Sequence, residues 1–126
     1  MKSAKDYLAE ANAVVPKLSS TEAVELYKRG GAVFVDVRDS AAIASSGTIA
    51  GAERVARGMM EFVADPSMEA FYNDKLQKDA KICLICGAGG QAALAGKTMQ
   101  EMGFTDVVNI GGFKDWVAAG GPVEEG

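Results

Sequence analysis

Cys86 is the residue of this chain whose surroundings are best suited to chemistry. It follows a short apolar run, Ile82–Ile85, that is typical of a buried strand. A turn with three glycines, residues 87–90, comes next, and a helical pattern begins at about Gln91. Such a turn directs several backbone N–H groups into one small space, where the helix also presents the positive end of its dipole. A cysteine sulfur at this place would be stabilised as a thiolate, so we predict that Cys86 is a nucleophile.

Two other interpretations of the cysteines remain open. Cys83 and Cys86 form a C-x-x-C pair, which could be a thioredoxin-like redox pair. Three residues of strand span about 10 Å, however, whereas a disulfide needs Cα atoms within roughly 7 Å. The two side chains would also point to opposite faces of the sheet. We therefore interpret Cys83 as a small buried residue, and the alternative for Cys86 is the same structural role.

Several other kinds of site lack the residues that they need. The chain has no histidine, which removes Cys-His and Ser-His-Asp arrangements and the usual metal ligands. No second cysteine pair is available for a zinc site. The glycine-rich turn is followed by neither the Gly-Lys-Ser/Thr of a phosphate-binding loop nor the spacing of a dinucleotide fingerprint. We expect no metal, and backbone dipoles and cations would have to activate Cys86.

Composition places the chain among ordinary globular proteins. Its 126 residues predict one domain, and 48% apolar with 24% charged residues is a common balance. A net charge of −4, without a basic stripe, argues against nucleic acid as a main partner. The polar N-terminus has no signal-peptide core, and no apolar run has membrane-spanning length. We expect a cytoplasmic protein that does not bind membranes.

Strand and helix patterns alternate along the chain. A short amphipathic helix is expected at Ala4–Val14, ended by Pro16. A helix is expected from Ser19 to Gly30, with Ser19 and Glu22 as a capping box. In the first half of the chain it is followed by a strand at Ala32–Val37, a short helix at 40–46, a weak strand near Val55 and a short helix at 59–63. The second half is expected to contain a helix at 68–76, the strand before Cys86, a helix at 91–102, a strand at 106–110 and a last helix at 113–118. This alternation predicts an α/β fold whose mostly parallel sheet has helices on both faces.

Charged residues follow the first of these strands. Asp36, Arg38 and Asp39 stand at its carboxyl end, which is where open α/β sheets place their ligands. Arg38, Arg54 and Arg57 are candidates for anion binding, although surface arginines usually make no such contact. Asp36 could orient a neighbouring group, or it could cap a turn.

Taken together, several segments resemble a rhodanese domain from Leu18 to Glu124. The segments that carry the resemblance are Phe34–Asp39, Gly47–Ala52, Ile85–Gln91 and the glycine-rich ending from Gly103 through Trp116 to Pro122. The resemblance implies a single domain over residues 1–126, with residues 1–16 as a helical extension. It also implies a five-stranded, mostly parallel sheet and a six-residue active-site loop from Cys86 to Gln91.

The resemblance further implies sulfur transfer. Cys86 would take sulfane sulfur from a donor such as thiosulfate, hold it as a persulfide and pass it to cyanide or a thiol. No cofactor is implied, and a protein could replace either small-molecule partner. The residues expected to contact substrate are Gly87, Ala88, Gly89, Gly90, Gln91, Arg57 and Arg38, with Asp36 in support.

This chain departs from the usual pattern at the loop. Family loops usually end in arginine, where this chain has Gln91, and often have a basic residue at Gly87, so this loop has no cation. Relatives tend to have histidine or asparagine at Arg54 and proline at Ala56. Arg57 fits one bacterial subgroup and is the best remaining substrate cation.

Two alternatives follow: a weakly active or non-catalytic sulfur-carrier or interaction module, and a phosphatase or arsenate reductase of the related fold. The second alternative needs a longer loop that ends in arginine.

Overall fold

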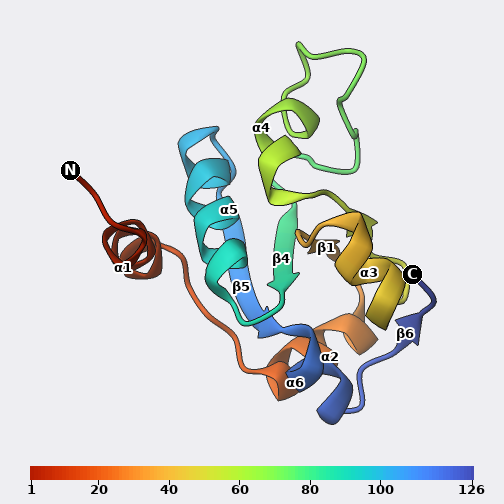
Figure 1. Cartoon of the computed structure of the whole chain (residues 1–126). Coiled ribbons are helices and arrows are strands. Elements are labelled where there is room, and N and C mark those ends of the chain that lie inside the picture. The colour runs from red at the N-terminus through yellow and green to blue at the C-terminus, as the bar shows by residue number, and fades with distance from the viewer.

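The computed structural model describes the whole chain, Met1–Gly126, as a parallel sheet between two layers of helices (Figure 1). The sheet has the strand order β3-β1-β4-β5, with β1 at Ala32–Asp36, β3 at Glu53–Arg54, β4 at Lys81–Cys86 and β5 at Asp106–Gly112. A separate antiparallel pair joins β2, Thr48–Ile49, to β6, Val123–Glu124. The helices are α1 at Ala4–Val14, α2 at Ser20–Arg29, α3 at Ser40–Ser46, the 3-10 turn η1 at Arg57–Met59, α4 at Met60–Val63, α5 at Gly90–Glu101 and α6 at Phe113–Ala118.

The sheet is buried on both faces, as the apolar strands predict. On one face, Leu84 and Cys86 of β4 pack in a core with Ala95 and other residues of α4 and α5. On the other face, Cys83 and Ile85 pack in a second core with α2 and α6. The expectation of a mostly parallel sheet with helices on both faces is confirmed.

Local signals predict both ends of α2. Ser19 and Glu22 form the capping box expected before α2, with each side chain accepting a backbone N–H of the other residue. The same helix stops at Gly30, whose φ of 80° favours glycine. A second capping box, Ser3 with Asp6, starts α1 and was not among the predicted features.

The strand count and one helix differ from expectation. The main sheet has four strands rather than five, and the segment Pro16–Leu18 lies beside β5, where Lys17 makes a single bridge to Asn109. Pro16 has no N–H and Ser19 already caps α2, so this segment is too short to pair further.

The helix expected at 68–76 is absent, because residues 65–80 form successive turns. Two of these turns are held by side-chain acceptors that compete with helix hydrogen bonds, Asp65 to Ser67 and Asn73 to Lys75.

Helix α1 lies beside α5, set apart from the sheet (Figure 1). The two helices approach closely at Gly96, where an added Cβ would lie 2.9 Å from Cγ1 of Val15. Gln100 also donates a hydrogen bond to the carbonyl of Val14. These contacts fix the C-terminal end of α1, and so its first turns lie near the start of α5. No helix in the structure combines the length and the apolar character that crossing a bilayer requires.

Candidate active site

The sulfur of Cys86 lies at the end of β4, inside a cradle of backbone amides. Its Sγ accepts hydrogen bonds from the N–H of Gly89 at 3.0 Å and the N–H of Ala92 at 3.3 Å. The first amide belongs to the loop and the second to the first turn of α5, so the helix dipole also acts at the sulfur. Only 1% of the Cys86 surface is exposed. Backbone N–H groups that face a sulfur in this way can stabilise negative charge that develops on it.

The loop is held in place by the end of the neighbouring strand β5. Asn109, which is buried, donates through its side-chain amide to the Gly89 carbonyl at 2.9 Å and accepts from the Gly111 N–H at 2.8 Å. Gly112 pairs with Cys86 after an irregularity in the β4–β5 register. A Cβ at Gly112 would lie 2.5 Å from the Gly87 carbonyl oxygen, so only glycine lets the loop lie this close.

Asn109 and Gly112 were not among the predicted site residues. A signal for the first is present in the sequence, because Asn109 is a polar residue within the apolar run Val107–Ile110. A buried polar side chain needs partners, and the glycine-rich loop supplies them. The sequence offers no comparable signal for Gly112, because its requirement depends on which loop lies against it.

The loop contains no cation, and among the predicted residues Arg57 is the cation that lines a hollow together with loop residues. The Gln91 side chain is exposed, and it lines the same surface hollow as Arg57. Arg57 donates to Thr98 Oγ1 at 3.1 Å and to Glu61 Oε1 at 3.3 Å. Because Glu61 is an exposed partner, this ion pair is weak, and Arg57 keeps the capacity to bind an anion.

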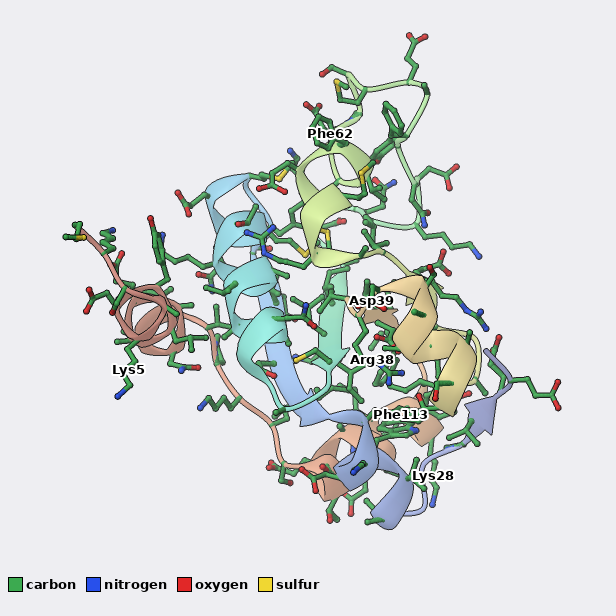
Figure 2. The ribbon with its side chains drawn as sticks, viewed as in Figure 1. Lys5, Lys28, Arg38, Asp39, Phe62 and Phe113 are labelled. Atoms are coloured by element: carbon green, nitrogen blue, oxygen red, sulfur yellow. The ribbon has the colours of Figure 1, made fainter.

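Arg38 has a structural environment, which argues against the prediction that it binds substrate. All three of its guanidinium nitrogens donate within the protein, to the Asp36 carboxylate, to Ser46 Oγ and to the Gly47 carbonyl. The group also lies 4.6 Å from the ring centroid of Phe113, and Figure 2 shows these two side chains together. Asp36 is fully buried and accepts hydrogen bonds from Arg38 and from Thr48 Oγ1 of β2, so its partners lie outside the Cys86 loop.

Arg54 is also engaged away from the loop. Its guanidinium donates to the Glu124 carboxylate at 3.0 Å and to the Glu125 carbonyl at 2.8 Å. These contacts attach the C-terminal segment to β3. Among the three candidate arginines, Arg57 alone shares a hollow with loop residues of the site.

Cys83 and Cys86 do not form a redox pair in this structure. Both are free thiols, and their side chains pack in the cores on opposite faces of the sheet. Burial raises the pKa of the Cys83 thiol from its ordinary value of 9.0 to about 12. Cys83 is therefore an inert core residue, as predicted.

A comparison of the sequence with known protein families agrees with the observed fold. A sequence model of the rhodanese-like domain matches residues 19–119. The chain belongs to the rhodanese family. A thiosulfate sulfurtransferase GlpE of Pseudomonas putida is 31% identical to this chain over 104 residues, which cover 81% of this chain and 84% of the relative.

Solved structures agree on the rhodanese fold. A Rhodopseudomonas palustris protein of unknown function, described as a possible tyrosine phosphatase, has a TM-score of 0.91 and 38% identity, over 98% of this chain and 96% of its own. The polysulfide-sulfur transferase homodimer of Wolinella succinogenes has a TM-score of 0.74 and 26% identity, over 97% and 87%. The human single-domain sulfurtransferase TSTD1, at 24% identity, has a TM-score of 0.72 over 82% and 96% and supports the fold alone.

Proposed function

We propose that this protein is a sulfurtransferase that carries sulfane sulfur as a persulfide on Cys86. The observation that carries the proposal is the position of the Cys86 sulfur, which accepts two backbone N–H groups at the start of α5. Amides that stabilise a thiolate also stabilise a persulfide anion, and they do so without a histidine base. Membership of the rhodanese family and similarity to a thiosulfate sulfurtransferase support the same chemistry.

The reaction has two nucleophilic steps. The Cys86 thiolate attacks the terminal sulfur of thiosulfate or a related donor, the new S–S bond forms, and sulfite leaves with the electron pair of the broken bond. Cyanide or a thiolate then attacks the outer sulfur of the persulfide and regenerates the Cys86 thiolate. No electrons are supplied from outside, so the cycle needs no cofactor. Because Cys86 is only 1% exposed, a donor must present its sulfur as a single protruding atom.

A second candidate is a weakly active sulfur carrier that receives sulfur from, or delivers it to, another protein. The uncharged loop favours this candidate, because charge-assisted contacts to an anion are roughly twice as strong as neutral ones. A phosphatase is less well supported. A tetrahedral oxyanion needs cationic or abundant amide donors around it, and this loop is short and ends in neutral Gln91.

Intact-mass spectrometry after incubation with thiosulfate tests the proposal. The wild type is expected to gain the mass of one sulfur atom and to lose it again on addition of cyanide, with thiocyanate released. Cys86→Ala is expected to abolish both changes, whereas Cys83→Ala should retain most of the activity because its thiol lies on the opposite face.

Three other outcomes identify the alternatives. A persulfide that forms from a protein or organic persulfide but not from thiosulfate favours the sulfur carrier. No added sulfur with any donor, together with hydrolysis of an aryl phosphate, favours the phosphatase. Equal loss of transfer in both folded cysteine variants contradicts a single nucleophile.

A further inference from the structure

A hollow of about 450 Å³ lies beside the active-site loop. Gly90 and Gln91 of the loop form one side of it, and Leu94 and Arg57 continue this side. The opposite wall comes from α1, which lies outside the part of the chain that matches the rhodanese-like domain. The residues that α1 contributes are Ala4, Tyr7 and Leu8.

Helix α1 packs against the loop through Leu8. An added Cβ at Gly90 would lie 3.4 Å from Cδ2 of Leu8, which is ordinary packing distance. Val15, packed against Gly96, anchors the other end of the helix. Tyr7 is 52% exposed, which is high for an aromatic residue, and it lines the mouth of the hollow while Lys2 Nζ lies 5.3 Å from its ring centroid.

The hollow is mostly apolar and carries a single positive charge. Arg57 is its only charged lining residue, and Gln91 is neutral. Two lysines near the start of α1 add little to this charge. Lys2, which precedes the helix, lies over the Tyr7 ring, but its charge is paired with the Glu10 carboxylate at 2.8 Å. Figure 2 shows Lys5 pointing away from α5. One cation beside apolar walls is poorly matched to a small dianion, which keeps its hydration shell in such a place. A hollow with one cation and apolar walls is better matched to an anion that has one charge and an apolar body.

We propose that α1, through Tyr7 and Leu8, makes this protein selective for singly charged sulfur donors with an apolar body, such as aromatic thiosulfonates or hydrophobic persulfides. This inference rests on the proposed function of Cys86. With a thiosulfonate, the Cys86 thiolate attacks the terminal sulfur and forms the persulfide. The bond between the two donor sulfurs breaks, and its electron pair leaves with the sulfinate. Cyanide then takes the outer sulfur as thiocyanate.

Two donors with the same reacting group test the inference. Benzenethiosulfonate and methanethiosulfonate differ only in the apolar body, so we measure kcat/KM for each with cyanide as the acceptor. The wild type is expected to prefer the aromatic donor by about tenfold, which is the effect of burying part of a ring. Tyr7→Ala and, separately, Leu8→Ala should each lower this ratio by about threefold or more. Tyr7→Phe, which keeps the ring, should preserve it.

Val14→Ala is the matched control, because Val14 is an exposed residue of the same helix that does not line the hollow. It should leave both kcat/KM values unchanged, and circular dichroism verifies that every variant keeps its helices. A wild type that uses both donors equally well overturns the inference and leaves the proposed function standing. An unchanged ratio in both folded alanine variants also overturns it. A wild type that forms no persulfide with either donor or with thiosulfate overturns the proposed function itself.

Discussion

The two cysteines of β4 have opposite chemical surroundings although they are three positions apart. Cys86 accepts hydrogen bonds from two amides at the start of a helix, whereas Cys83 lies among apolar side chains of the other core. Amide donors stabilise the anionic form of a thiol, and an apolar core destabilises it. One residue is therefore suited to nucleophilic attack and the other to packing.

The pKa of Cys83 predicts a loss of stability at high pH. Because burial raises this pKa from 9.0 to about 12, the unfolded chain loses the proton first as the pH rises. The stabilisation is fully present below pH 9 and is lost between pH 9 and about 12. From pH 8 to pH 10, the wild type should lose about 1.4 kcal/mol more unfolding free energy than Cys83→Ala. Urea denaturation at each pH measures this difference, and parallel pH profiles would contradict the expectation.

Gln91→Arg is expected to raise kcat/KM for thiosulfate by about tenfold. The side chain is exposed at the start of α5, where a guanidinium could make charge-assisted hydrogen bonds to the sulfonate oxygens. Exposure limits the gain, and the cation faces the unfavourable end of the helix dipole at a cost of about 0.3–1 kcal/mol in stability. Steady-state kinetics at two salt concentrations check the result, because the gain should decrease with salt.

Gln91→Met is the control for that substitution, because it has a similar length and no charge. It should not raise the activity with thiosulfate. If Gln91→Arg is folded yet no faster than the wild type, Gln91 does not occupy the place of an anion contact. A neutral or protein-bound donor would then fit the loop better.

At the scale of elements, the active-site loop depends on strand β5 as much as on β4. The side chain of Asn109 bridges β5 to the loop, and Gly112 provides the space in which the loop lies. Helix α5 supplies the amide of Ala92, and α1 covers the flank of the loop at Gly90. Four elements therefore meet at one short segment.

Gly112→Ala is expected to lower sulfur transfer by about tenfold or more. The new methyl group would displace the Gly87 carbonyl, which lies only 2.5 Å from the Cβ position, and with it the amides that face Cys86. Backbone shifts of this kind also cost about 1–3 kcal/mol in stability. Gly58→Ala is the control, since a Cβ there meets no atom within 4 Å. Unchanged kcat/KM in folded Gly112→Ala would show that the loop does not need this close approach.

At the scale of the whole molecule, a buried ion pair joins elements that are distant in sequence. Arg38 and Asp36 lie at the end of β1, and their hydrogen bonds reach Ser46 of α3 and Thr48 of β2. The Arg38 guanidinium also packs on Phe113 at the start of α6. The carboxyl end of β1 is thus joined to α3, β2 and α6 by one connected set of contacts.

Arg38→Ala is expected to lower the unfolding free energy by about 3–5 kcal/mol, because it leaves the fully buried Asp36 carboxylate without its cation. Arg54→Ala is the comparison, because Arg54 and Glu124 form an exposed ion pair worth about 0–1 kcal/mol. Chemical denaturation of both variants measures the difference. Equal, small losses would mean that the Arg38 network contributes little to stability.

The sequence by itself determined the features that depend on neighbours a few residues apart. The capping box at Ser19, the apolar strand before Cys86 and the glycine-rich turn into α5 are all local patterns, and they were sufficient to predict α2, β4 and the start of α5. Together with the other family-like segments, they also pointed to the rhodanese fold. The position of Cys83 on the opposite face followed from the two-residue period of a strand.

The tertiary structure alone decided which distant groups meet. Asn109 and Gly89 are 20 positions apart, and no local pattern pairs them. Arg38 lies at the end of β1 where a ligand was expected, but its guanidinium donates to the carbonyl of Gly47, which ends α3, and so it has a structural role. Helix α1 was predictable as a helix, but its place beside the loop depends on the fit of Val15 against Gly96. Such contacts depend on the shapes of elements after they have packed, which short-range patterns in the sequence do not specify.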